Sequence, residues 1–159
     1  MTTPVQLACA RSAHFDLGTG YHGDVWLDLD ALFLRPALLR PHVRWLADRL
    51  AGHQVDAVCG PLEGGAFLAQ AIADVLGSAC VPARRRTRPR QGDGYRLPAV
   101  PGGIVGWRVA IVDDAINAGT AVRACVQQVR DAGAVPVAVA ALLSLGQARA
   151  RIEAALAVP

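Results

Sequence analysis

The chain has 159 residues, of which 53% are hydrophobic and 18% charged, and its formal net charge is +3. This composition fits a single globular domain and excludes an intrinsically disordered chain. No apolar run approaches the roughly 20 residues of a membrane-spanning helix, and residues 1–10 lack the pattern of a secretory signal. We therefore expect a cytoplasmic protein without disulfides, in which cysteines within apolar runs are small buried side chains.

The first 54 residues differ in pattern from the rest of the chain. Extended segments are expected around Phe15 to Leu29, followed by a helix from about Pro36 to Leu50. The extended part alone indicates a glycine-rich loop and an edge strand with Trp26 in the core. We interpret residues 1–54 as a small subdomain attached to a core of residues 55–159, the whole forming one domain.

From residue 55 onward, short apolar runs alternate with helix-length amphipathic segments, which is typical of parallel β-α-β units. The expected strands are Val55–Cys59, Ala79–Ala83, Arg108–Val112 and Val135–Leu143, and the expected helices are Ala66–Leu76, Thr120–Ala132 and Gly146–Ala157. The unbroken apolar content of the last strand predicts burial on both of its faces. The fold class is therefore α/β, with a parallel sheet flanked by helices.

Residues 84–103 are rich in arginine, proline and glycine and show no periodicity. All sixteen basic residues of the chain are arginines, and six of them fall between Arg84 and Arg96. A loop of this length in a compact domain is usually functional, so we expect a lid. Clustered basic residues can bind nucleic acid, but no aromatic-rich surface or DNA-binding motif accompanies them. A small phosphorylated ligand is therefore favoured over nucleic acid, and a solvated, disordered charge run is the alternative.

The most informative run is Val-Ala-Ile-Val-Asp-Asp-Ala-Ile-Asn-Ala-Gly-Thr-Ala, residues 109–121. Asp113 and Asp114 follow a buried strand, at the end where ligands bind in open parallel sheets. The small residues from Asn117 to Thr120 allow several backbone N–H groups to converge on one anion, and the next helix adds its positive end. The two carboxylates can accept hydrogen bonds from sugar hydroxyls, and the adjacent N–H groups can donate to a phosphate. Together they suit a sugar phosphate. Two alternatives remain for these residues alone: a metal-binding phosphotransfer site and a simple helix cap.

The run from Asp113 resembles the phosphoribosyl pyrophosphate signature of type I phosphoribosyltransferases, and it is most similar to the orotate version, Asp-Asp-Val-Ile-Thr-Ala-Gly-Thr-Ala. The resemblance implies that Asp113 and Asp114 act at the ribose hydroxyls and that the following loop binds the 5-phosphate. The residues of this phosphate loop are Asn117, Ala118, Gly119, Thr120 and Ala121.

A second glycine-rich turn, Gly-Pro-Leu-Glu-Gly-Gly, connects the first core strand to its helix. Alone it is a weak signal, because such turns are often only tight connections. It is similar to the pyrophosphate loop of the family, commonly Gly-Pro-x-x-x-Gly and often containing a cis peptide. The implied pyrophosphate-binding residues are Gly60, Pro61, Leu62, Glu63, Gly64 and Gly65. Some orotate enzymes have a lysine at the position of Gly64.

The run from Phe15 to Asp28 resembles the hood strand of orotate enzymes, Phe-x-Leu-x-Ser-Gly-x-x-Ser-x-x-Tyr-x-Asp, which lies over the base. The implied base-binding residues are Leu17, Gly18, Thr19, Gly20 and Gln147. Gln147 stands where the orotate enzymes have an arginine that pairs with the orotate carboxylate, and Arg149 lies two residues further on. A glutamine can hydrogen-bond an amide-like edge, but it cannot neutralise a carboxylate.

The arginine-rich segment occupies the position of the mobile catalytic loop of the family. Arg86, Arg88 and Arg90 are the implied catalytic arginines. A guanidinium stays charged, so it acts by electrostatic stabilisation of the leaving pyrophosphate and not as a proton donor.

The family resemblance also implies the partners of the protein. They are phosphoribosyl pyrophosphate, a nitrogenous base, Mg²⁺ bound mainly through the substrate without a protein metal site, and a second copy of the chain in a homodimer. Three hypotheses remain for function: an orotate enzyme with altered contacts, a phosphoribosyltransferase for another base, and a noncatalytic sensor of phosphoribosyl pyrophosphate or nucleotides.

Overall fold

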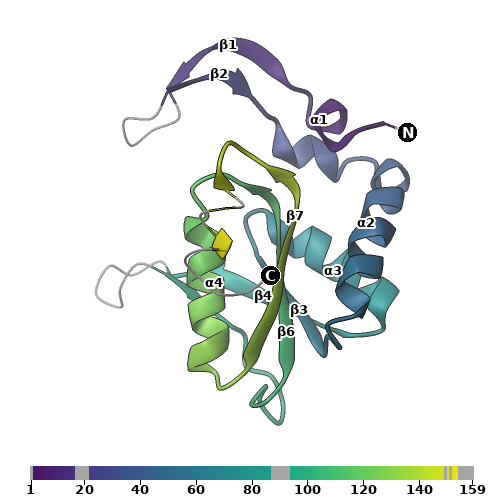
Figure 1. Ribbon diagram of the computed structural model, residues 1–159, viewed down its shortest axis with the longest axis vertical. Helices are drawn as coiled ribbons and strands as arrows, with labels where there is room; N and C mark the ends of the chain where they lie inside the picture. The colour runs from purple at the N-terminus through teal and green to yellow at the C-terminus, as the bar shows by residue number, and fades with distance from the viewer. Residues whose placement is uncertain (1, 17–21, 87–93, 149, 151, 154–159) are drawn as a thin grey trace. The chain divides into compact units, whose positions relative to one another are not determined.

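The computed structural model describes residues 2–16, 22–86, 94–148, 150 and 152–153 (Figure 1). The chain forms two compact units, Met1–Pro41 and His42–Pro159. Their division lies within helix α2 (Pro36–Ala51), whereas the sequence suggests a boundary after residue 54. Among the described residues, no helix has both the length and the apolar character needed to cross a membrane.

The first unit contains a β-hairpin where the sequence predicts extended segments. Its elements are α1 (Pro4–Leu7), β1 (Arg11–Asp16), β2 (His22–Trp26) and the 3-10 helix η1 (Leu29–Leu32). Helix α1 is not among the elements predicted from the sequence, and it begins with a capping box between Thr3 and Gln6. Trp26 is 41% exposed and contacts Phe15, with ring centroids 5.9 Å apart. Trp26 is therefore not the core residue that the edge-strand interpretation assumes.

The second unit is built on a five-stranded sheet of order β5-β4-β3-β6-β7. The strands are β3 (Ala57–Pro61), β4 (Ala79–Arg85), β5 (Tyr95–Arg96), β6 (Arg108–Ile116) and β7 (Val135–Ser144). All adjacent pairs are parallel except β4 with β5. Helix α3 (Gly65–Leu76) lies on one side of the sheet and α4 (Thr120–Asp131) on the other (Figure 1). The predicted parallel α/β fold is confirmed.

The strand order reverses at β3, the central strand. The chain passes from β3 to β4 on one side, and β6 then pairs with β3 on the other. In open α/β sheets such a switch point places the loops at the carboxyl ends of the two central strands around a shared crevice. The predicted pyrophosphate loop, Gly60–Gly65, follows β3, and the predicted phosphate loop, Asn117–Ala121, follows β6.

Strand β6 is longer than the sequence predicts. It runs through Ile116 and not only to Val112, because β7 pairs with it as far as Ile116 opposite Ser144. Pairing with β3 ends earlier, at Ile111. Beyond that residue β6 is held by β7 on one side, while its other edge is open to the loop that follows β3.

The predicted lid and the predicted last strand also need correction. Arg85 pairs with Tyr95 in a short antiparallel hairpin, so residues 84–103 are not wholly structureless. Strand β7 ends the sheet order, and residues 139–142 are only partly buried, so the strand is not buried on both faces. An apolar run of alanines and valines does not distinguish a central strand from a margin of the sheet.

The core of the second unit includes buried side chains from β6 and α4, among them Ile111, Val122 and Cys125. Cys59 and Cys125 are buried, and all four cysteines are free thiols. Of the predicted closing helix, the described residues 148, 150, 152 and 153 are helical, and its end lies outside the described residues.

Candidate functional site

Two carboxylates lie side by side on the part of β6 that β3 no longer pairs. Asp113 and Asp114 are each 7% exposed. The Asp113 carboxylate accepts hydrogen bonds from the Asp114 N–H, at 3.1 Å, and from the Gly65 N–H. The Asp114 carboxylate accepts one from the Ala115 N–H at 2.6 Å. Through Gly65, Asp113 is tied to the start of α3 as well as to its own strand.

The pyrophosphate loop packs closely against these acids. A Cβ at Gly65 would collide with the Val112 carbonyl oxygen and would lie 2.9 Å from the Cα of Asp113. A Cβ at Gly64 would lie 3.0 Å from both carboxylate oxygens of Asp114. A lysine at position 64 would therefore require Asp114 to move. The described residues contain no cis peptide bond, so the cis bond suggested by the family resemblance is not present in this loop.

The phosphate loop ends at the amino terminus of α4, where Thr120 is exposed. Gly119 is the N-cap, with φ of +73°, and no side chain caps the helix there. The first intrahelical bond runs from the Arg123 N–H to the Gly119 carbonyl, at 2.9 Å. The N–H groups of Thr120, Ala121 and Val122 precede that bond, so they have no partner within the helix. Donors of this kind at the positive end of a helix suit an anion.

Arg123 and Ile152 support this loop, and neither is among the site residues predicted from the sequence. The Arg123 Nη1 donates to the Ala118 carbonyl at 2.6 Å, and its Nη2 donates to the Thr120 hydroxyl at 3.4 Å. The Ile152 Cδ1 lies 2.5 Å from where a Cβ on Gly119 would be. The sequence signal for Arg123 was a basic residue one turn into the helix that follows the loop. Thr120 itself remains exposed.

Comparison with known proteins places this arrangement in a family. No protein-family model matches the chain. The orotate phosphoribosyltransferase of Caldanaerobacter subterraneus subsp. tengcongensis is 27% identical over 139 residues, which are 87% of this chain and 70% of that protein. The adenine phosphoribosyltransferase of Thermobifida fusca is 34% identical over 143 residues, which are 81% of this chain and 80% of that protein. The chain belongs to the type I phosphoribosyltransferases.

The fold of this phosphoribosyltransferase has close structural counterparts. The crystal structure of orotate phosphoribosyltransferase from Aeropyrum pernix aligns with a TM-score of 0.77 and 21% identity, covering 94% of this chain and 83% of that one. The family resemblance drawn from the sequence is confirmed, and the protein is a pentosyltransferase.

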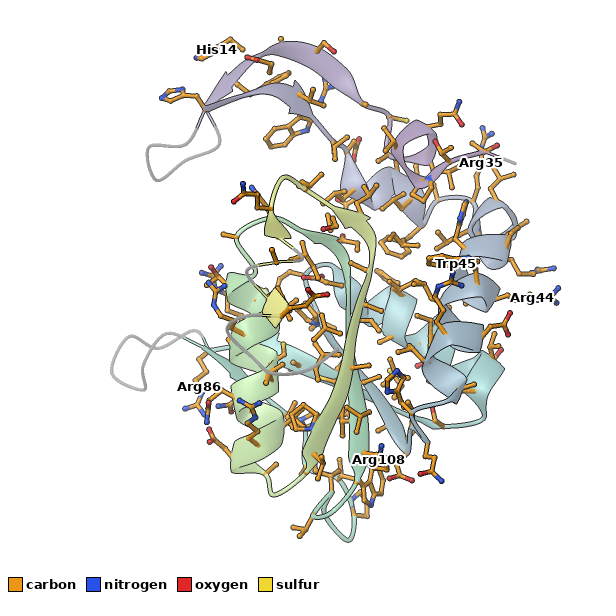
Figure 2. All side chains as sticks on the ribbon, in the orientation of Figure 1. His14, Arg35, Arg44, Trp45, Arg86 and Arg108 are labelled. Atoms are coloured by element: carbon orange, nitrogen blue, oxygen red, sulfur yellow. The ribbon has the colours of Figure 1, made fainter. Side chains whose placement is uncertain are left out.

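Arg86 is placed away from the phosphate loop of this phosphoribosyltransferase. Its Nε donates to the Tyr95 carbonyl at 3.2 Å, and its Nη2 donates to the Gln128 side-chain oxygen at 3.3 Å. Gln128 is eight residues beyond Thr120 on α4, which corresponds to roughly 12 Å along the helix axis. Figure 2 shows Arg86 beside the half of α4 that is remote from its amino terminus. The other two predicted arginines, Arg88 and Arg90, lie outside the described residues.

Only one predicted base-binding residue can be placed. Gln147 is exposed and follows the end of β7. The four hood residues Leu17, Gly18, Thr19 and Gly20 lie outside the described residues, as does Arg149. Of the predicted site, the structure brings together the acids and the pyrophosphate loop, and it places the phosphate loop after the same strand as the acids.

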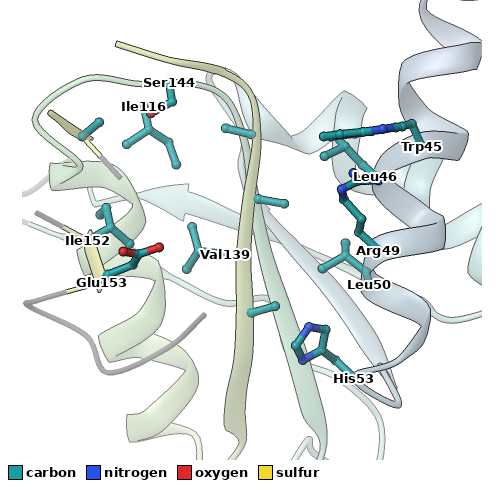
Figure 3. Close-up of a pocket in the computed structure, with 14 residues that line it drawn as sticks. Trp45, Leu46, Arg49, Leu50, His53, Ile116, Val139, Ser144, Ile152 and Glu153 are labelled. Atoms are coloured by element: carbon teal, nitrogen blue, oxygen red, sulfur yellow. The ribbon is translucent and has the colours of Figure 1, made fainter. Parts of the chain in front are cut away.

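A hollow of about 480 Å³ lies along β7 in the second unit. Figure 3 shows β7 passing through it, with Trp45 and Arg49 of α2 on one side and Ile116 and Ile152 on the other. Its lining contains none of the predicted site residues. The Arg49 guanidinium is stacked 3.6 Å above the Trp45 ring. Because neither the acids nor the two predicted loops line it, the hollow lacks the groups that suit a sugar phosphate.

Asp113 is expected to make the free energy of unfolding decrease as the pH rises from about 4 to about 7. Burial, followed by the neighbouring charge of Asp114, raises the pKa of Asp113 from 3.8 to about 7. Between these values the folded chain holds a proton that the unfolded chain has lost, so a rising pH favours unfolding. Since each unit of pKa corresponds to about 1.4 kcal/mol, the decrease should amount to a few kcal/mol.

Urea unfolding at about pH 5 and about pH 8 measures this effect. Asp113→Asn should reduce the difference between the two conditions, because an amide stays neutral throughout. Asp74→Asn removes an exposed carboxyl from α3 and should preserve the difference. If Asp113→Asn retains the full difference seen in the wild type, another group is responsible for it.

Proposed function

We propose that the protein transfers ribose 5-phosphate from phosphoribosyl pyrophosphate to a nitrogenous base, with orotate or a related pyrimidine favoured. The base nitrogen forms a bond to the anomeric carbon while the bond from that carbon to the pyrophosphate oxygen breaks. The transition state resembles an oxocarbenium ion. Positioning and electrostatic stabilisation supply most of the acceleration in such a displacement, and no protein nucleophile is needed.

One observation supports this proposal most directly. At the switch point of the sheet, the pyrophosphate loop is packed against Asp113 and Asp114. The amino terminus of α4, which no side chain caps, follows the same strand as the two acids. A phosphoribosyl pyrophosphate molecule has a phosphate at one end, vicinal hydroxyls in the middle and a pyrophosphate beside them. The order of donors and acceptors in the site corresponds to the order of these groups.

The roles of the residues follow from this correspondence. The phosphate loop, Asn117–Ala121, receives the 5-phosphate, and Gly60–Gly65 faces the pyrophosphate through backbone N–H groups. Asp113 and Asp114 accept from the ribose hydroxyls. We expect Asp114 to contribute more than Asp113 to binding the ribose hydroxyls, because the Asp113 carboxylate also accepts a hydrogen bond from the Gly65 N–H. Arg86, Arg88 and Arg90 are proposed to stabilise the leaving group, although the described contacts of Arg86 are with the β4–β5 hairpin and α4.

We propose that Mg²⁺ binds mainly through the substrate. Within the described residues, no group of three or more histidine, cysteine, aspartate or glutamate side chains is arranged to hold a metal ion. Mg²⁺ commonly binds through substrate phosphates with few protein ligands, and this donor set fits such a mode. When bound to the pyrophosphate, the ion would neutralise charge on the leaving group. The Asp114 carboxylate lies beside Gly64 of the pyrophosphate loop and would be an adjoining protein group.

The identity of the base has two candidates with separate support. Orotate is supported by the hood resemblance and by the orotate phosphoribosyltransferase that aligns with 87% of the chain. A different base, with adenine as the first candidate, is supported by the higher identity of 34% to an adenine phosphoribosyltransferase. Gln147 also favours a neutral base, because it cannot neutralise the carboxylate of orotate.

A base screen with detection of released pyrophosphate tests the proposal. The protein is supplied with Mg²⁺, phosphoribosyl pyrophosphate and, in turn, orotate, uracil and adenine. Orotate and uracil differ by the carboxylate, so faster release with orotate supports the favoured assignment. Release with adenine alone selects the second candidate. If no base causes release while phosphoribosyl pyrophosphate still binds, the protein is a noncatalytic sensor.

The proposal also includes a two-fold homodimer and a cytoplasmic location.

A further inference from the structure

We infer that Arg123 is a positioning residue for the 5-phosphate. It fixes the orientation of two groups in the phosphate loop. This inference rests on the proposed binding of a sugar phosphate at Asn117–Ala121. The family signature ends at the position of Ala121, so it does not include Arg123. The guanidinium of Arg123 contacts the loop at Ala118 and Thr120, on either side of Gly119.

The first oriented group is the Ala118 carbonyl. A loop that offers N–H groups to a phosphate also contains carbonyl oxygens, which repel the anion if they turn toward it. The Ala118 oxygen lies 2.6 Å from Nη1 of Arg123, which is the short separation of a charge-assisted hydrogen bond. This bond holds the carbonyl toward the guanidinium, so the neighbouring N–H groups can face the anion.

The second oriented group is the Thr120 hydroxyl, which has one hydrogen and two lone pairs. Arg123 has only donors, so in their contact of 3.4 Å the Thr120 oxygen must be the acceptor. The hydroxyl hydrogen is then available to the phosphate. The guanidinium also stays charged at any working pH, which adds to the positive end of α4.

The backbone at Gly119 makes this arrangement possible. Nη1 of Arg123 lies 3.2 Å from where a Cβ on Gly119 would be, and Ile152 approaches the same point. The guanidinium reaches both sides of Gly119 with two nitrogens of one planar fork. A lysine has a single ammonium group, so it can replace the charge but not both oriented contacts.

Arg123→Gln, Arg123→Lys and Arg130→Gln form the test. Arg130 lies in the last turn of the same helix, so its variant removes an equal charge from the opposite end. The dissociation constant of ribose 5-phosphate is measured by calorimetry on the full chain. The KM for phosphoribosyl pyrophosphate and kcat come from pyrophosphate release. Arg123→Gln should weaken both sugar-phosphate constants by about tenfold or more, which is the effect of losing one charged hydrogen bond.

The other measurements separate positioning from a general structural role. The kcat of Arg123→Gln should change much less than its KM, because the phosphate is remote from the reacting carbon. Arg123→Lys should recover only part of the affinity, and Arg130→Gln should behave as the wild type. Wild-type affinity for ribose 5-phosphate in Arg123→Gln would overturn the inference, as would equal losses of affinity in Arg123→Gln and Arg130→Gln. In either case, pyrophosphate release by the wild type would still support the proposed function. If the wild type neither binds ribose 5-phosphate nor releases pyrophosphate, the proposed function fails.

Discussion

Gly65→Ala is expected to lower the free energy of unfolding by about 3 kcal/mol, the upper part of the range for an overpacked site, and to remove measurable transfer activity. The added methyl group would collide with the Val112 carbonyl oxygen and would lie 2.9 Å from the Cα of Asp113. These are backbone atoms of β6, so no side-chain rotation relieves the contact. The loop must separate from β6, and the Gly65 N–H then leaves the Asp113 carboxylate.

Urea unfolding and initial rates of pyrophosphate release measure the two effects. Gly52→Ala is the matched control, because a Cβ at Gly52 has nothing within 4 Å. That variant should keep both the stability and the rate of the wild type. Full activity in Gly65→Ala would mean that the contact between the loop and β6 is not needed for the reaction.

Asp114→Asn should reduce kcat/KM by about 100-fold or more, because it replaces hydrogen bonds from ribose hydroxyls to a charged acceptor, each worth roughly 1.5–3 kcal/mol. The amide has the shape of the carboxylate and can still accept from the Ala115 N–H, so the fold should be retained. Its NH₂ group, however, can only donate, and it faces hydroxyls that need an acceptor. We expect the affinity for phosphoribosyl pyrophosphate to decrease along with the rate.

Steady-state kinetics and calorimetry with ribose 5-phosphate provide the measurement for this variant. Asp74→Asn removes a carboxyl from the exposed face of α3 and should leave the kinetics unchanged. Gly64→Ala gives an independent route to the same carboxylate, because its methyl group would lie 3.0 Å from both Asp114 oxygens. An Asp114→Asn protein with wild-type affinity would remove Asp114 from the proposed ribose site.

The sequence predicts those elements whose boundaries are local. Helix α3 was expected at Ala66–Leu76 and is observed at Gly65–Leu76, ending at Gly77, which has a φ of +65°. Helix α4 and the order of strands and helices in the core follow from apolar periodicity in the same way. The acid pair and the pyrophosphate loop are identified because each directly follows an apolar run that predicts a strand. The phosphate loop is identified because a turn of small residues follows the acid pair and precedes a helix.

The structural features that could not be predicted from the sequence depend on contacts between segments that are distant along the chain. Strand β5 has two residues, and only its pairing with β4 makes it a strand. The carboxyl end of β6 contains two acids and looks like a loop until β7 is found to pair with it. The contact of Ile152 with Gly119 joins residues 33 positions apart. Arg123 was overlooked because a basic residue on an amphipathic helix normally suggests solvent exposure.

The one-sided pairing of β6 affects the local stability of the site. Past Ile111, β7 is the one strand that pairs with the segment containing Asp113 and Asp114, and β7 is itself the margin of the sheet. The segment with the acids is therefore expected to open together with β7, and its amide protons should exchange with solvent sooner than those of β3. Substitutions on the outer strand that touch no ligand can then weaken substrate affinity, since they shift the fraction of time for which the acids are in place.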